Sequence, residues 1–260
     1  ALQRARDARA RVAIVTVSDR SPGAALADVV VATGELDASW CHTIGYLSPI
    51  LAASAIAGHL TGRPITGRAA RSALAAGLDP SELRRTEAVA TALGEAERII
   101  VTGSGTDRVA ARELALKLEE GTHLPATARD LETVLHGHLA GMDARTALVL
   151  VLADTSPDPD DRARRATDVL RAASEVGIRA GAILAARYAP VVDPVLTPAG
   201  RLIVPAAPAL PATIAALLGS AVPLQLLTER LARVRGVNPD PIRRDEPAWL
   251  HAAEAAEPAT

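Results

Sequence analysis

Several residue types are scarce in this sequence, and each scarcity narrows the class of protein. The 260 residues include one cysteine, which excludes an internal disulfide and the cysteine-rich zinc patterns. Aromatic residues make up 2% of the chain, so Ala, Leu, Val and Ile must fill the core. The net charge is −2, without a basic segment that would favour nucleic acid or an anionic membrane. We therefore expect a soluble globular protein of the cytoplasm, with neither nucleic acid nor membrane as a partner.

Two features concern targeting and the limits of the chain. No signal peptide is visible. Residues 205–227 form an apolar run long enough to cross a bilayer, but the run contains four prolines, so we interpret it as a buried helix. The sequence starts at Ala1 and soon enters an apolar strand pattern, which we interpret as a sign of a fragment or a processed chain.

Short apolar runs alternate with helical patterns. The predicted strands are residues 12–17, 29–33, 98–102, 146–153, 181–185 and 201–205, and the predicted helices lie near residues 47–60, 66–76, 80–94, 107–120, 163–176 and 210–234. Continuously apolar strands are typical of a parallel sheet that is covered on both faces. We therefore predict an α/β fold of two units with parallel sheets, joined by helices.

A glycine turn follows the third predicted strand. It consists of Gly103, Ser104, Gly105 and Thr106, and we expect Asp107 to cap the helix that comes next. A turn of this kind presents backbone N–H groups to an anion such as phosphate. The alternative is a tight turn that only packing requires.

The only lysine of the chain lies on the helix after this turn. Glu113, Lys117 and Glu120 have the spacing i, i+4 and i+7, which places them on one helix face. Such a pair on a solvated face stabilises a helix by a few tenths of a kcal/mol, and this is the ordinary interpretation. His136 follows Glu120 by sixteen residues and precedes a glycine.

This block carries a resemblance to a known family. The segment "GSGTDRVAARELALKLEEGTHLPATARDLETVLHG" (103–137) resembles the second domain of the two-domain sugar isomerase (SIS) family, which includes the isomerase half of glucosamine-6-phosphate synthase and fructosamine-phosphate deglycases. The segments 34–52 and 222–245 are also similar to that family. The resemblance implies three-layer αβα sandwiches of flavodoxin type, with an incomplete first SIS domain at 1–61, a helical linker at 62–93, the second SIS domain at 94–240 and a tail at 241–260.

The resemblance also implies a chemistry. Family members move a proton between C1 and C2 of phosphorylated sugars or aminosugars through an enediol or enolamine. Glu120 matches the family's base and His136 its ring-opening group, which a neighbouring subunit supplies in the synthase, so a homodimer is expected. Glu113 and Lys117 match supporting groups. The matching substrate contacts are the turn 103–106 and Trp40, His42 and Thr43. Neither a metal nor a cofactor is expected.

The sequence departs from the family in three places. His138 stands where proline is usual, the tail lacks the lysine that forms a Schiff base in the synthase, and the loop that holds the sugar phosphate is expected before residue 1. These departures favour a deglycase or an aminosugar-phosphate deaminase or isomerase over the synthase. A non-catalytic module that binds sugar phosphates stays open as the alternative.

Overall fold

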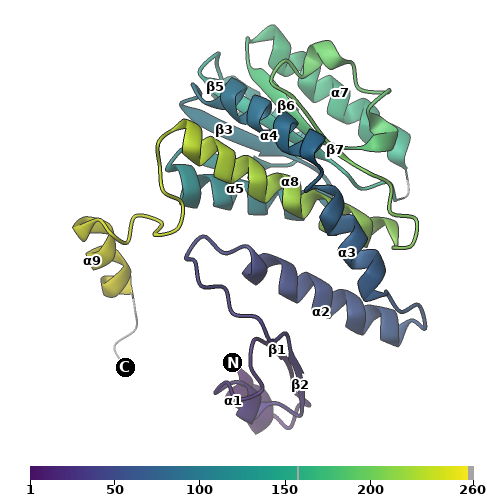
Figure 1. Ribbon diagram of the computed structural model, residues 1–260, viewed down its shortest axis with the longest axis vertical. Coiled ribbons are helices and arrows are strands. Elements are labelled where there is room, and N and C mark those ends of the chain that lie inside the picture. The colour runs from purple at the N-terminus through teal and green to yellow at the C-terminus, as the bar shows by residue number, and fades with distance from the viewer. Residues whose placement is uncertain (157, 257–260) are drawn as a thin grey trace. The chain divides into compact units, whose positions relative to one another are not determined.

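The structure is a computed structural model that describes residues 1–156 and 158–256. It divides into two compact units, Ala1–Thr66 and Gly67–Thr260 (Figure 1). The last four residues of the predicted tail, 257–260, lie outside the described residues. Each unit is described by itself.

The first unit contains a pair of parallel strands. Its elements are α1 (Leu2–Asp7), β1 (Ala13–Thr16), the 3₁₀ turn η1 (Ala24–Leu26), β2 (Val29–Ala32) and α2 (Ile44–Leu60). Ala13 pairs with Val29 and Thr16 with Ala32. Asp28 stabilises the start of the pair, because its carboxylate accepts a 2.7 Å hydrogen bond from the N–H of Val12. The predicted strands are confirmed, whereas two strands do not establish a second complete SIS domain.

The second unit holds one five-stranded sheet. Its helices are α3 (Gly67–Ala76), α4 (Pro80–Leu93), α5 (Asp107–Thr122), α6 (Leu131–Leu135), α7 (Pro159–Glu175), α8 (Ala212–Val234) and α9 (Pro247–Ala256). Its strands are β3 (Arg98–Thr102), β4 (Ala126–Arg129), β5 (Thr146–Leu152), β6 (Arg179–Ala185) and β7 (Gly200–Val204). The 3₁₀ turns η2 (His138–Gly141), η3 (Ala186–Tyr188) and η4 (Pro194–Leu196) complete it.

All five strands are parallel, in the order β4-β3-β5-β6-β7. Helices α4, α5 and α8 cover one face and α7 covers the other (Figure 1). From β3 the chain first adds β4 on one side of β3 and then adds β5, β6 and β7 on the opposite side. The direction of winding therefore reverses between β3 and β5. In open α/β sheets ligands bind beyond the carboxyl ends of the strands at such a reversal. The predicted α/β fold with parallel sheets is confirmed.

Aliphatic side chains build the core, as the low aromatic content predicts. All seven residues of β5 are buried, since helices cover both faces of that central strand. The core cluster under α7 consists of Leu, Val, Ala and Ile side chains with a single aromatic residue, Tyr188. Small side chains let helices approach the sheet closely, and this close packing replaces the area that aromatic rings would bury.

Helix α8 is long and apolar enough to cross a membrane, judged by length and composition. In the structure it packs against α3, α4 and α5 and contacts β6 and β7. Half of its most apolar stretch is buried inside the protein. The expectation of a buried helix is confirmed.

The sequence missed several short elements. Strand β4 and helices α1, α6 and α9 are absent from the predicted strands and helices. Helices α3 and α4 lie within the predicted linker 62–93, which stays a prediction; α4 packs on β7, and both helices pack on α8. Short elements carry too few residues to show a periodicity, so only their tertiary contacts define them.

The close approach of α8 to β7 generates a test of the packing. A Cβ atom on Gly219 would overlap Cγ1 of Val204, whereas a Cβ on Gly67 would meet open space. We expect Gly219→Val to lower the free energy of unfolding by about 1–3 kcal/mol, because the added side chain would push α8 and Val204 apart. Urea unfolding with Gly67→Val as the matched control measures this. Equal stability of the two variants would contradict the described contact.

Candidate functional site

A cluster of three charged side chains, with the buried Lys117 between two glutamates, lies on one face of α5. Lys117 Nζ lies 2.5 Å from Glu120 Oε2 and 3.8 Å from Glu113 Oε1. The side chain of Lys117 is 5% exposed, against 13% for Glu113 and 21% for Glu120. The prediction that the three charges share one helix face is confirmed. The ordinary interpretation, in which this face is solvated, is wrong because Lys117 is buried. Lysine is almost never fully buried unless it is paired.

The two carboxylates have different surroundings. Glu120 accepts the hydrogen bond of Lys117, while Oε1 of Glu113 is buried and accepts no hydrogen bond from the described residues. Burial raises the pKa of Glu113, Lys117 opposes this shift and the charge of Glu120 adds to it. Lys117 therefore holds Glu120 in place, and Glu120 is the member of the cluster that solvent or a ligand can reach.

A histidine nitrogen is buried just beyond the end of α5. The sequence analysis did not include this histidine among the candidate site residues. His123 follows the helix in the left-handed conformation, with φ of 58°. Its Nε2 atom is buried and has no hydrogen-bond partner among the described residues. Burial and the charge of Arg243 lower the pKa of His123, so a neutral imidazole is favoured near the Glu120 end of the helix.

The glycine turn lies at the opposite end of α5. The helix has 16 residues, and the fourteen steps from Thr106 to Glu120 correspond to roughly 20 Å along its axis. The structure therefore does not bring the turn and the charged cluster into one pocket within this unit. Ser104 hydrogen-bonds within the protein: its hydroxyl donates a 2.6 Å hydrogen bond to Asp130 and accepts one from the N–H of Leu131.

Asp107 does not cap α5, contrary to the expectation. Thr106 occupies the cap position, and Asp107 is the first helical residue. Its buried carboxylate accepts hydrogen bonds from the N–H groups of Ala153 (3.0 Å) and Asp154 (2.9 Å), which follow β5. Burial raises the pKa of Asp107 to about 7, although the two N–H groups oppose the shift. Asp107 thus joins the start of α5 to the end of β5.

Asp154 belongs to the same network. Burial opposes its ionisation, but hydrogen bonds from Ser156 and Thr106 and the charge of Arg162 lower its pKa. Its backbone oxygen accepts hydrogen bonds from Arg162 and from the hydroxyl of Tyr188, both at 2.8 Å. The sequence analysis missed this network. The signal that could have revealed it is Asp154 itself, an acidic residue that follows the apolar strand β5 closely.

His136 is exposed at the end of α6. Its side chain is 73% exposed, and Nε2 lies 3.4 Å from Glu132 Oε2. Glu132 also accepts hydrogen bonds from Arg165, which, together with the charge of His136, lower the pKa of Glu132. Within this chain the structure does not bring His136 to the cluster on α5.

Trp40, His42 and Thr43 belong to the first unit, in the turn before α2. Asp37 organises this turn, since its carboxylate accepts hydrogen bonds from the N–H groups of Thr43 (2.6 Å) and Gly45 (3.1 Å). The side chain of Trp40 is half exposed, and the thiol of Cys41 is buried. The assignment of these residues to substrate binding stays a prediction.

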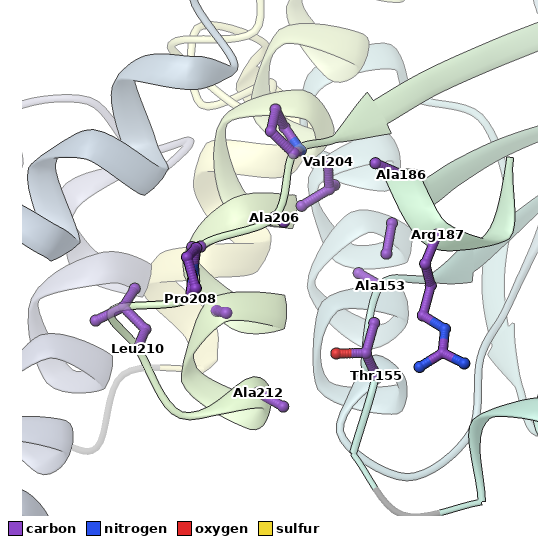
Figure 2. Close-up of a pocket in the computed structure, with 13 residues that line it drawn as sticks. Ala153, Thr155, Ala186, Arg187, Val204, Ala206, Pro208, Leu210 and Ala212 are labelled. Atoms are coloured by element: carbon purple, nitrogen blue, oxygen red, sulfur yellow. The ribbon is translucent and has the colours of Figure 1, made fainter.

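A cavity of about 310 Å³ lies at the carboxyl ends of β5, β6 and β7 (Figure 2). Its walls come from the residues after these strands and from the first turn of α8, with Val204, Pro208 and Leu210 on one side and Ala153, Thr155 and Arg187 on the other. Sequence reasoning did not find this cavity, because its alanines and prolines carry no recognisable motif.

Comparisons with known proteins agree with this topology. The chain is similar to the C-terminal domain of glucosamine-fructose-6-phosphate aminotransferase from Francisella tularensis, with 18% identity and a TM-score of 0.77 over 92% of this chain and 69% of that one. It is also similar to tagatose-6-phosphate ketose/aldose isomerase from Escherichia coli (22% identity, TM-score 0.67, 90% and 63% covered) and to glucosamine-6-phosphate deaminase from Thermotoga maritima (18%, 0.63, 90% and 66%). At these identities the likeness shows the fold, and no curated protein sequence matches the chain.

Fold and topology therefore define a doubly wound α/β protein of the kind found in sugar-phosphate isomerases. Residues 92–183 match the family model of the SIS domain. The match lies within the second unit, and it confirms the resemblance seen in the sequence.

The buried network generates a prediction about pH. The pKa of Asp107 is about 7 in the folded protein against its ordinary value of 3.8, so between these pH values the folded state binds more protons than the unfolded state. The contribution of Asp107 to stability is therefore fully present below the unfolded pKa and is lost as the pH rises through about 7.

We expect Asp107→Asn to remove this part of the pH dependence, because its side-chain oxygen can still accept both N–H groups without ionising. Urea unfolding of both proteins across this pH range measures the difference. Parallel stability curves for the two proteins would rule out a raised pKa at Asp107.

Proposed function

We propose that this protein acts on a phosphorylated sugar or aminosugar, as an isomerase, deaminase or deglycase, with Glu120 as the group that moves the proton. The observation that carries the proposal is the buried Lys117 between Glu113 and Glu120. Only 5% of the Lys117 side chain is exposed. Burying its charge costs free energy, which a helix with a purely structural role would avoid with an apolar residue. The SIS domain and its sugar-phosphate isomerase neighbours support the substrate class.

The cluster has the parts that proton transfer between two carbons requires. A carboxylate that removes a proton from the carbon beside a carbonyl leaves an enediolate. Return of that proton to the neighbouring carbon, with transfer of the hydroxyl proton from one oxygen to the other, yields the isomer. Glu120 is exposed enough to contact a sugar, and its hydrogen bond to Lys117 keeps one carboxylate oxygen fixed. The second oxygen is the candidate base.

Lys117 and Glu113 set the electrostatics of this step. Lys117 Nζ lies 2.5 Å from Glu120 Oε2, so a positive charge is held beside the proposed base. Burial raises the pKa of Glu113, and the charge of Lys117 opposes this shift. We propose that Glu113 positions Lys117 and does not contact the substrate.

His136 is proposed as the group that opens the sugar ring, supplied to the cluster of a second copy of the chain. An imidazole gives and takes protons near neutral pH. The side chain is exposed on its own chain, and its contact with Glu132 orients the ring. The alternative, a module that binds sugar phosphates without turnover, predicts binding without proton exchange.

The role of Glu120 can be tested without knowing the product. In the full-length protein, exchange of the C2 or C1 proton with deuterated solvent is followed by NMR for fructose 6-phosphate, glucosamine 6-phosphate and fructosamine 6-phosphate. We expect Glu120→Gln to slow the exchange by about 10²–10⁴-fold with nearly unchanged binding, which is the usual loss for a general base.

Glu175→Gln, an exposed carboxylate on α7, is the matched control and should exchange at the wild-type rate. Glu113→Gln should weaken folding and exchange together. Exchange at the wild-type rate in Glu120→Gln would refute the assignment, and binding without exchange in the wild type would support the non-catalytic module.

The shared site predicts complementation between two inactive variants. If His136 acts on the cluster of the partner, a mixed dimer of Glu120→Gln and His136→Asn has one site with both mutations and one intact site. Random mixing should then restore about a quarter of the wild-type exchange rate. Light scattering should show a dimer or a larger assembly. A fully active monomer, or mixtures that stay inactive, would show that the site is not shared.

A further inference from the structure

We propose that the cavity at the carboxyl ends of β5, β6 and β7 is a second binding site, for a small carboxylate with a compact apolar body. It is distinct from the cluster on α5. The cavity lies at the end of the sheet where α5 begins, while Glu120 lies at the other end of that helix. The inference does not depend on the proposed function, since it uses none of the same side chains.

The walls of the cavity determine what it can hold. Seven of its thirteen lining residues are alanines, and Val204, Leu210 and two prolines provide most of the rest. Methyl and ring carbons line the cavity, and they form no hydrogen bonds with a ligand. Most hydroxyl groups of a phosphorylated sugar would lack side-chain partners there, and burying an unpaired polar group is unfavourable. The walls favour an apolar ligand body.

One side of the cavity is polar. Thr155 and Arg187 provide the side chains that can hydrogen-bond, and they lie on the same side in Figure 2. No described lining residue is acidic, so the cavity carries the positive charge of a single guanidinium. A guanidinium pairs with a carboxylate through two parallel hydrogen bonds, and the hydroxyl of Thr155 can donate a further one.

Arg187 is available for this role. Its partner Asp160 lies 3.5 Å away and is 94% exposed, so water weakens that ion pair. The guanidinium also lies 5.7 Å from the centre of the Tyr188 ring, and Tyr188 is buried and fixed by its hydrogen bond to Asp154. Tyr188 and Asp160 thus orient Arg187, and its guanidinium keeps N–H groups that can bind a ligand.

The start of α8 adds to the preference for an anion. Pro211 precedes the helix and provides no side-chain hydrogen bond to its first turn, and Ala212 and Ala215 of that turn line the cavity. The positive end of the helix dipole therefore faces the same space as Arg187. An apolar body with a single carboxylate matches both the walls and the charge.

The size of the cavity restricts the ligand further. A volume of about 310 Å³ is at the lower end of the range for small-molecule sites. We take 3-methylbutanoate as the probe, because it joins a branched apolar group to one carboxylate. Isothermal titration should give a Kd on the order of 0.1–1 mM, as expected for a ligand of about seven non-hydrogen atoms.

Variants and analogues separate the parts of the proposal. Arg187→Leu should weaken binding of 3-methylbutanoate by about tenfold or more, the usual effect of losing a charged hydrogen bond. Arg164→Leu removes an exposed arginine of α7 that does not line the cavity, so it should bind as the wild type does. Ala215→Leu fills the cavity and should abolish binding while the protein stays folded by circular dichroism.

The neutral analogue 3-methylbutanamide should bind much more weakly than the carboxylate. Fructose 6-phosphate and inorganic phosphate should not compete with the probe. Three results would overturn the proposal: no saturable binding of 3-methylbutanoate in the millimolar range, equal binding by Arg187→Leu, or displacement of the probe by fructose 6-phosphate through Arg187.

Discussion

The close packing of α5 and α8 on a fully buried parallel sheet is the constraint on which the rest of the structure depends. With few aromatic side chains, the core gains apolar contacts mainly where helices approach the strands closely. Gly219 of α8 therefore lies against Val204 of β7, and α5 is covered by the sheet and by α8. This covering takes Lys117 out of solvent, and burial makes its contacts with Glu113 and Glu120 chemically significant.

The same packing separates two regions along α5. Its first residue, Asp107, accepts hydrogen bonds from the residues after β5, while its last turns carry the charged cluster. Parallel strands place all their carboxyl ends at one edge of the sheet, so the glycine turn, the Asp154 network and the alanine-lined cavity gather there. The charged cluster lies toward the other edge. One domain thus offers two chemically different surroundings, connected by the helices α5 and α8.

Electrostatics in each region follow from what surrounds each group. Asp107 and Glu113 have raised pKa values because burial disfavours their charged forms, whereas Asp154 has a lowered pKa because hydrogen bonds and Arg162 outweigh burial. Three carboxyl groups in one small domain therefore differ in the direction of their pKa shifts. Arg187 differs again, since its ion pair with Asp160 is exposed to solvent and leaves it able to bind another anion.

The sequence by itself determined the fold class, most strands and helices, and the face of α5 that carries Glu113, Lys117 and Glu120. These follow from local periodicity, which the order of residues contains directly. Only the tertiary structure decided that Lys117 is buried, that Asp107 joins β5 and does not cap α5, and that His136 stays exposed on its own chain. It also decided that alanines from three strand ends enclose a cavity beside Arg187. Burial, hydrogen bonds between distant segments and cavity shape depend on residues far apart in the chain, and no local pattern encodes them.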